Sequence, residues 1–170
     1  MLYPISVRNG RGEQNSFGYV DDAGQIIVEP VFTGAASFSE GKACVLDQQG
    51  KAGYIDQAGE LVIPHRFTVL SRFVQGLCST DGGFIDHQGS WMIQPRFLVC
   101  SHFSEGRAFA SLDGVHFGYI GFNGDFTTAS TFDRCCPFSE GLAAVLLNLR
   151  WGYIDHQGRK KRVELTRMTK

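Results

Sequence analysis

Arg150-Trp151-Gly152-Tyr153-Ile154-Asp155-His156-Gln157-Gly158 is the stretch that decides the fold. Its centre, a glycine followed by an aromatic and an aliphatic residue, recurs at Gly18-Tyr19-Val20, Gly53-Tyr54-Ile55, Gly83-Phe84-Ile85 and Gly118-Tyr119-Ile120. Self-similarity at intervals of 30 to 35 residues is typical of a repeat protein, in which each unit buries its apolar face against its neighbours. The sequence therefore predicts a repeat architecture, which accounts for most motif residues before any chemistry is considered.

The spacing around this centre is regular. A phenylalanine follows the turn glycine by eight residues, a second follows six residues later, and another glycine comes three residues beyond it. The first set is Phe32, Phe67, Phe97 and Phe132, and the second set is Phe38, Phe73, Phe103 and Phe138. Only the distance from the last glycine to the next glycine-aromatic pair varies, so we place the length variation in one hairpin turn, where insertions cost little.

Each repeat is predicted to be a three-stranded antiparallel meander, because short runs of β-branched and aromatic residues alternate with turn residues. In the second repeat the expected strands are 43–46, 52–56 and 60–63. Two dipeptides, Asp81-Gly82 and Asn9-Gly10, are typical of two-residue hairpins whose central residues adopt positive φ.

Prolines follow the expected third strands at Pro30, Pro64 and Pro95. Proline lacks the N–H group that a sheet ladder needs, so we expect each one to end its sheet. The connecting segment that follows, such as 96–103, carries the two phenylalanines and is expected to pack between successive units. Burial of each ring is worth about 1.5–3 kcal/mol, so these rings would dominate cohesion.

The predicted fold is an all-β repeat protein of about five meanders in a single domain, residues 1–170. The units are about 3–30, 42–64, 76–95, 107–128 and 142–165. An open, solenoid-like stack is favoured, because no segment must complete a blade across the termini, and a closed, small propeller-like ring is the alternative. Helix is not favoured, since the chain holds 21 glycines and no long segment has a 3.6-residue apolar period.

The stretch 150–158, together with Pro137-Phe138-Ser139-Glu140-Gly141, resembles the WG-repeat family of bacterial β-repeat proteins. The resemblance covers about 17–158. Tryptophan precedes the glycine only at Trp151, and Gly121 replaces the usual aspartate. The resemblance implies a repeat scaffold that acts in protein interaction, and it supplies no catalytic residues.

Composition and charge favour a soluble cytoplasmic protein. The formal net charge of −1 gives no electrostatic reason to expect nucleic acid or an anionic membrane. The one basic cluster, Arg159-Lys160-Lys161-Arg162, is read as an edge strand protected from aggregation, with nucleic-acid binding as an alternative. No signal peptide or spanning segment is apparent. The five cysteines suit a reducing compartment, and Cys100 and Cys135 are expected to be small core residues.

The repeated polar residues are given structural roles. Asp21, Asp56, Asp86 and Asp155 each stand three residues before a glycine, where a carboxylate can accept backbone N–H bonds and cap a tight turn. The glutamates Glu40, Glu105 and Glu140 are expected to order loops beside positive-φ glycines. His87 and His156 occupy identical turns on separate repeats, so a shared zinc site is not expected. We predict no catalytic residue, no metal and no cofactor.

Residues that differ between equivalent positions are better functional candidates, because the scaffold does not dictate them. The predicted partner-binding residues are Arg66, Arg72, Arg96, His102 and Arg134. Polar and basic side chains of this kind are enriched in recognition surfaces. Trp91 replaces an aliphatic strand residue and is expected in the core.

The sequence therefore predicts a non-enzymatic protein-binding scaffold. A narrower hypothesis is an immunity protein that neutralises a toxin or effector. An enzyme or small-ligand binder with a site between repeats is the alternative from another class, but no convergent set of titratable groups supports it.

Overall fold

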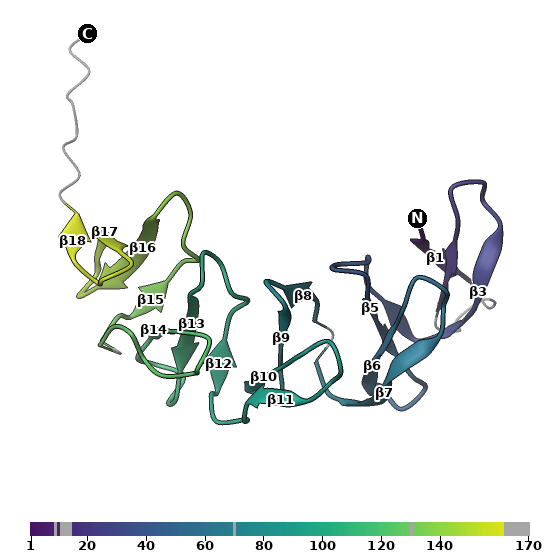
Figure 1. Cartoon of the computed structure of the whole chain (residues 1–170), viewed down its shortest axis with the longest axis horizontal. Helices are drawn as coiled ribbons and strands as arrows, with labels where there is room; N and C mark the ends of the chain where they lie inside the picture. The colour runs from purple at the N-terminus through teal and green to yellow at the C-terminus, as the bar shows by residue number, and fades with distance from the viewer. Residues whose placement is uncertain (9, 11–14, 70, 130, 162–170) are drawn as a thin grey trace, which may run out of the picture. The chain divides into compact units, whose positions relative to one another are not determined.

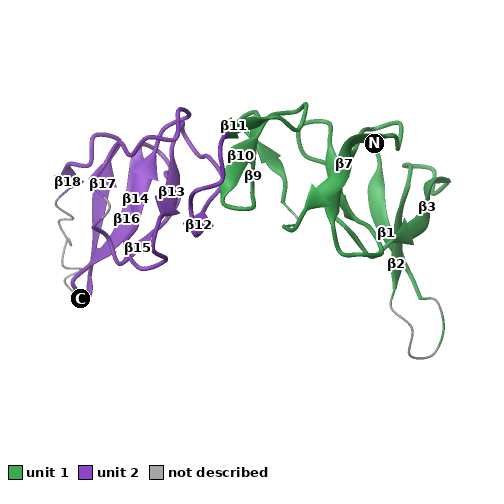
Figure 2. Cartoon of the chain, turned by 90° about the horizontal axis from the view of Figure 1, so that it is seen from below, with its two compact units in different colours: residues 1–92 green, residues 93–170 purple. Residues whose placement is uncertain are grey.

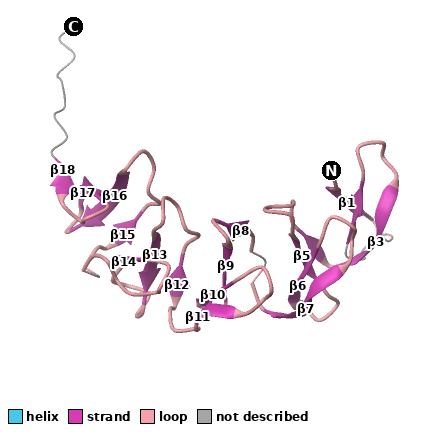
Figure 3. Cartoon of the chain, in the orientation of Figure 1, coloured by secondary structure: helices cyan, strands magenta, loops and turns pink. Residues whose placement is uncertain are grey.

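The computed structural model describes residues 1–161 except 9, 11–14, 70 and 130. Every regular element among these residues is a β-strand, and Figure 3 shows strands and loops without helix. The strands form small antiparallel sheets, none of which closes into a barrel. The prediction of an all-β repeat fold is confirmed.

Strand order repeats along the chain (Figure 1). The first sheet consists of β1 (Tyr3–Val7), β2 (Ser16–Val20) and β3 (Ile26–Phe32). The second consists of β4 (Gly34–Ala35), β5 (Ala43–Leu46), β6 (Ala52–Ile55) and β7 (Leu61–Phe67). The third consists of β8 (Phe73–Val74), β9 (Leu77–Thr80), β10 (Gly83–Ile85) and β11 (Trp91–Ile93). The fourth consists of β12 (Val99–Cys100), β13 (Ala108–Ser111) and β14 (Gly118–Ile120). The fifth consists of β15 (Arg134–Cys135), β16 (Leu142–Leu147), β17 (Arg150–Asp155) and β18 (Lys160–Lys161).

The meander strands lie where the spacing predicts them. In the second sheet β5 has the expected bounds, and β6 and β7 begin within one residue of the expected positions. Asp81 and Gly82 adopt φ of 47° and 78° and join β9 to β10 as a two-residue turn. The other predicted turn, Asn9-Gly10, involves Asn9, which lies outside the described residues.

The connecting segments form strands that the sequence did not predict. In four sheets a two-residue strand from the connector (β4, β8, β12 or β15) pairs with the first meander strand. A Glu-Gly or Gln-Gly pair turns the chain between them, and its residues adopt positive φ, as at Glu40 (50°) and Gly41 (79°). Such a turn matches the twist of a hairpin, so the repeated glutamates belong to a hairpin turn.

The expectation that proline ends the sheets is wrong for Pro30 and Pro64. Both lie inside the third strand of their sheets, at a shift in the pairing register. In the first sheet Phe17 pairs with Phe32 but Tyr19 pairs with Val28, so the third strand has two extra residues between these pairs. The second sheet has the same shift between the pair Ala52 and Phe67 and the pair Tyr54 and Ile63. At such a bulge the missing N–H is not needed for the ladder. Only Pro95 follows its strand, β11.

These bulges explain the invariant glycine of the glycine-aromatic pair in the first two sheets. A Cβ atom on Gly18 would lie 2.4 Å from the carbonyl oxygen of Val28, and a Cβ on Gly53 would lie 2.8 Å from that of Ile63. Backbone atoms of the third strand therefore occupy the space of a side chain, and only glycine fits there.

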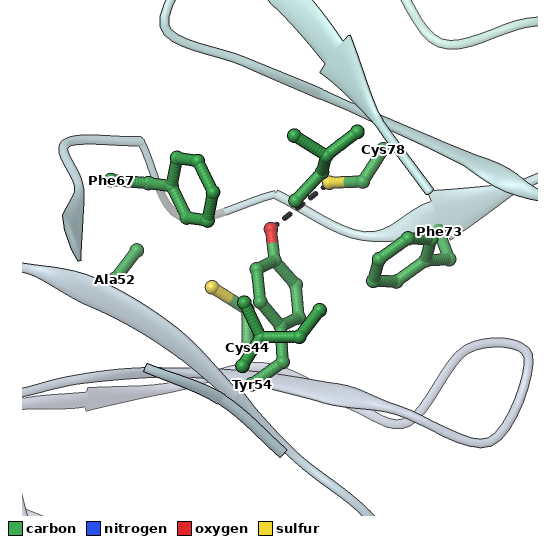
Figure 4. Packing of buried hydrophobic residues seen from close by; sticks show 8 residues of the cluster. Cys44, Ala52, Tyr54, Phe67, Phe73 and Cys78 are labelled. Carbon is green, nitrogen blue, oxygen red and sulfur yellow. Dashed lines mark hydrogen bonds between the residues drawn. The ribbon is translucent and has the colours of Figure 1, made fainter. Parts of the chain in front are cut away.

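The core lies between successive sheets. Tyr54, from the second sheet, is fully buried among Phe67, Phe73 and Cys78, and its hydroxyl lies 3.0 Å from the Cys78 Sγ (Figure 4). Trp91 packs against the same cluster, which confirms its expected place in the core. The equivalent clusters between the first two sheets and between the last two contain Tyr19 and Tyr119.

Internal contacts divide the chain into two compact units, Met1–Met92 and Ile93–Lys170 (Figure 2). The first unit contains the first two sheets and nearly all of the third, and the second contains the fourth and fifth.

Candidate functional site

Two of the predicted partner-binding residues join neighbouring repeats. Arg66 donates a hydrogen bond from its guanidinium to the carbonyl oxygen of Gly89, and its Cζ lies 4.9 Å from the ring centroid of Phe67. Arg96 forms the same contacts with Gly124 and, at 5.0 Å, with Phe97, and it also lies 3.8 Å from an Asp125 carboxylate oxygen. Each arginine therefore fixes the turn of the next repeat while its side chain stays partly exposed.

The other three predicted residues differ in exposure. Arg72 lies in the first unit and is exposed. In the second unit His102 is half-buried in the connector, whereas Arg134 is exposed at the start of β15. Arg134 lines a surface hollow.

This hollow lies in the second unit between the fourth and fifth sheets and has a volume of about 600 Å³. It is lined by Val99, Phe109, Gly114, Val115, Phe117, Asp133, Arg134 and Cys135. Its wall is mainly apolar, and Arg134 and Asp133 supply the only charged side chains among the lining residues.

Exposed apolar side chains surround the hollow. Leu98 is 71% exposed and Val115 62% exposed, and Leu112 and Val99 are also exposed. Leu98 and the hairpin tip are neighbours, because the Leu98 N–H donates to the Ser111 carbonyl. We call the surface formed by Leu98, Val99, Leu112, Val115 and Arg134 the apolar patch.

The hairpin that carries Leu112 and Val115 is ordered by Asp113. Its carboxylate accepts hydrogen bonds from the backbone N–H groups of Val115 and His116, from the His116 ring and from the Ser111 hydroxyl, at 2.7–3.0 Å. The bonds from His116 and Val115 hold the pKa of Asp113 well below its usual range. The exposed leucine and valine therefore sit on a hairpin with a defined conformation.

The repeated aspartates cap turns as predicted. One carboxylate oxygen of each aspartate accepts hydrogen bonds from the backbone N–H groups two and four residues later, at Asp21, Asp56, Asp86 and Asp155. The same geometry occurs at Asp47. These carboxylates are engaged in their own turns.

The glutamates reach into the following repeat. Glu40 accepts a hydrogen bond from the Gly76 N–H at 3.0 Å and lies 3.3 Å from Nε2 of His87, whose ring stacks on Phe73. The second unit repeats the arrangement with Glu105, Gly141, His156 and Phe138. The two histidines therefore contact glutamates in their own units, and no three His, Cys, Asp or Glu residues of the described chain gather where they could hold a metal ion.

Burial raises the pKa of three cysteine thiols. Desolvation raises the pKa of Cys44 to about 11 and that of Cys135 to about 12, and it also raises the pKa of Cys78. Thiols with such values stay protonated at neutral pH. Cys135 packs against the core cluster of the second unit, as expected, whereas Cys100 is half-buried in β12.

The basic cluster begins as the predicted edge strand, since β18 is the last strand of its sheet. Asp155 lies 2.8 Å from Nε of Arg159 and 3.2 Å from Nζ of Lys161. Burial opposes ionisation of this carboxyl, but hydrogen bonds from Arg159 and Lys161 outweigh it, and the pKa of Asp155 lies well below the usual range. Two of the four basic residues are thus paired internally, and Arg162 lies outside the described residues.

Sequence reasoning missed the apolar half of the patch. The signal was present: the turn Leu112-Asp113-Gly114-Val115 carries two large apolar residues, whereas the equivalent turn of the second repeat is Asp47-Gln48-Gln49-Gly50. Apolar residues at an exposed hairpin tip are not required by the fold.

The described residues include no helix able to cross a lipid bilayer.

A solved structure shares the fold, and a second gives a partial match. A computationally designed protein, Ika8, is similar with a TM-score of 0.54 at 11% identity, over 86% of this chain and 55% of that one. PorZ, a surface component of the type-IX secretion system of Porphyromonas gingivalis, matches with a TM-score of 0.39 at 15% identity, over 84% of this chain and 25% of that one. The chain thus spans about half the length of the designed protein and a quarter of PorZ. No curated protein matches the chain.

A family model for the WG containing repeat matches residues 17–51, 53–79, 83–115 and 117–148. Each match begins within one residue of the glycine of a glycine-aromatic pair. The chain therefore belongs to the family of proteins built from WG containing repeats.

Proposed function

We propose that this chain is a non-enzymatic, cytoplasmic protein-binding scaffold and that a partner protein binds the apolar patch. The observation that carries the proposal is the combination of exposed Leu98, Leu112 and Val115 with the 600 Å³ hollow beside Arg134. Large apolar side chains that cluster on a surface mark interaction sites, and a polar rim around an apolar centre is a common interface anatomy.

The finer proposal is that the partner is a toxin or effector and that the chain acts as its immunity protein. An ordered hairpin supports a tight complex, because a surface that is already fixed loses little conformational entropy on binding. The contacts of Asp113 supply this order. Neutralisation would follow if the bound surface of the toxin includes its active site.

The test uses exposed valine side chains outside the arginine contacts between repeats. Val115→Asp places a charge in the apolar patch, and Val31→Asp is the matched control because Val31 is 56% exposed in β3 of the first unit. Arg66 and Arg96 are unsuitable, since their charge reversal would also break the contact to the next repeat.

A partner captured from the cells that make the protein would be purified, and its affinity for each variant measured by calorimetry. We expect Val115→Asp to weaken binding more than tenfold, because hot spots lie in desolvated centres of interfaces, and Val31→Asp to change it less than twofold. Equal affinity of the wild type and a folded Val115→Asp variant would refute the proposed surface. Restored growth of cells that express the captured protein, lost with Val115→Asp, would support the immunity role.

A further inference from the structure

The hairpin tip of the fifth sheet contains a strained leucine. Asn148 and Leu149 join β16 to β17 and adopt φ of 52° and 61°. Asparagine tolerates this left-handed region, but in leucine the Cβ atom comes too close to the following carbonyl oxygen. In the tips of the second, third and fourth sheets a glycine has positive φ, at Gly50, Gly82 and Gly114. The leucine therefore stands in a backbone conformation that the other tips give to glycine.

Packing of the Leu149 side chain within the described chain does not offset this strain. The residue is 91% exposed, and an exposed leucine gains almost nothing from the hydrophobic effect. Backbone strain of this kind is found at functional sites, where it fixes a group in the position in which it is used. Leu149 is therefore a candidate for contact with another molecule.

The tip that carries Leu149 borders the hollow of the apolar patch. A carboxylate oxygen of Asp133 accepts a hydrogen bond from the backbone N–H of Asn148 at 2.8 Å. Asp133 also lines the hollow, together with Val115 and Arg134. All of these residues belong to the second unit. The tip is thus held beside the hollow, and Leu149 extends the exposed apolar surface to a second hairpin.

Two exposed arginines lie near this surface, Arg134 in β15 and Arg150 directly after the tip. Neither forms an ion pair with another described residue. The nearby carboxylates of Asp113 and Asp133 accept hydrogen bonds from backbone N–H groups of the two tips. Basic groups without an internal partner favour a binding surface of the opposite charge.

We propose that Leu149 is an anchor that enters an apolar pocket of a partner protein, and that carboxylates at the rim of this pocket pair with Arg134 and Arg150. This role rests on the proposed function, since the partner is the protein that covers the apolar patch. A leucine already fixed on a hairpin enters the pocket with little loss of conformational freedom. The strain of the tip keeps the side chain exposed for this contact.

Photo-crosslinking in the cells that make the protein tests the anchor. A benzophenone amino acid replaces Leu149, and the matched control carries it at Gln49, an exposed residue in the tip of the second sheet. The same label at Val115 tests the proposed function separately. We expect one protein to be joined at both Leu149 and Val115 and to be absent at Gln49. Its crosslinked peptide should contain apolar residues beside Asp or Glu.

The crosslinked protein, purified without the label, is the probe for calorimetry. Leu149→Ala and Leu149→Gly should each weaken its binding more than tenfold, since a buried leucine side chain is lost. Arg150→Gln should weaken binding about fivefold at low salt and less at high salt. In urea unfolding of the free chain, Leu149→Gly should have a higher midpoint than Leu149→Ala, because glycine relieves the strain of the tip.

A protein joined at Val115 but not at Leu149, or bound equally well by a folded Leu149→Gly variant, would overturn the anchor and leave the proposed function intact. A Leu149→Gly variant that unfolds at lower urea than the wild type would also overturn it, because the leucine would then support the fold. Self-association in sedimentation velocity that Leu149→Ala abolishes would make the occupant a second copy. No protein joined at either position would contradict the proposed function as well.

Discussion

Replacement of Tyr119 by phenylalanine tests how the repeats are joined. The substitution keeps the ring and removes one hydroxyl, which is buried and donates to the Cys136 carbonyl at 2.6 Å. Loss of a buried hydrogen bond that leaves its partner without this donor costs about 1–2 kcal/mol. Tyr153→Phe is the matched control, because the same change at the equivalent but exposed position should cost less than about 0.5 kcal/mol.

Urea unfolding followed by circular dichroism measures the difference. With a slope of about 2 kcal/mol per molar urea, Tyr119→Phe should lower the unfolding midpoint by about 0.5–1 M and Tyr153→Phe by less than about 0.25 M. Equal shifts of the two variants would refute the reasoning, because the hydroxyl would then contribute nothing by its contact with the next repeat. A repeat protein can unfold in stages, so the midpoint of the transition that includes the second unit is the quantity to compare.

Three further outcomes are expected. Gly53→Ala should destabilise the fold by more than about 2 kcal/mol in urea unfolding, because its Cβ would meet backbone, whereas Gly152→Ala should change it by less than about 0.5 kcal/mol; equal effects would contradict the bulge explanation. The pKa of Asp155 is depressed in the folded state, so its contribution to stability is present above the unfolded pKa of about 3.9 and is lost as pH falls. The free energies of unfolding of the wild type and Asp155→Asn should therefore differ most near pH 7 and converge in acid. A difference that stays constant with pH would contradict this. Cys44 and Cys78 should react with iodoacetamide at pH 8 more than 100-fold more slowly in the folded chain than in urea, because burial raises their pKa; rapid labelling of the native protein, located by mass spectrometry, would show that the cluster around Tyr54 opens.

The meander strands could be predicted because their signals are steric and local. Gly53 is required by a backbone atom of the facing strand, and Asp56 caps its own turn. Both requirements recur with each repeat, so the spacing of glycine, aspartate and phenylalanine located β5 and β6 within one residue.

The connector strands could not be predicted from the same signals. β4 and β15 have only two residues each, too short for a period to show. The prediction that Pro30 ends its sheet was wrong for a related reason. The proline is tolerated at a bulge, and the bulge depends on the register of the neighbouring strand. Register is a property of the pair of strands.

The contacts between repeats are visible in the sequence as paired residues. Glu40 and Glu105 are each followed in the next repeat by a histidine, His87 or His156. Where glutamine replaces the glutamate at Gln75, the corresponding position has Phe122. This substitution pattern is what a side-chain pair between repeats would produce.

One residue of the apolar patch, Arg134, is also a partner-binding residue expected from the sequence, and its role stays a prediction. Arg134 was singled out because the repeat does not dictate it, and it lines the hollow. By the same criterion Arg66 and Arg96 were selected, yet the structure shows their guanidinium groups on the turns of neighbouring repeats. Variation between repeats therefore indicates a role outside the common scaffold without telling a contact to the next repeat from a contact to a partner.

The most direct test of the protein-binding role is photo-crosslinking in the cells that make the protein, with a benzophenone amino acid at Val115 and, as control, at Val31. Both positions are exposed to a similar degree. The proposed function predicts one protein joined in high yield at Val115 and absent at Val31. No crosslinked protein at Val115, or the same proteins at both positions, would contradict it.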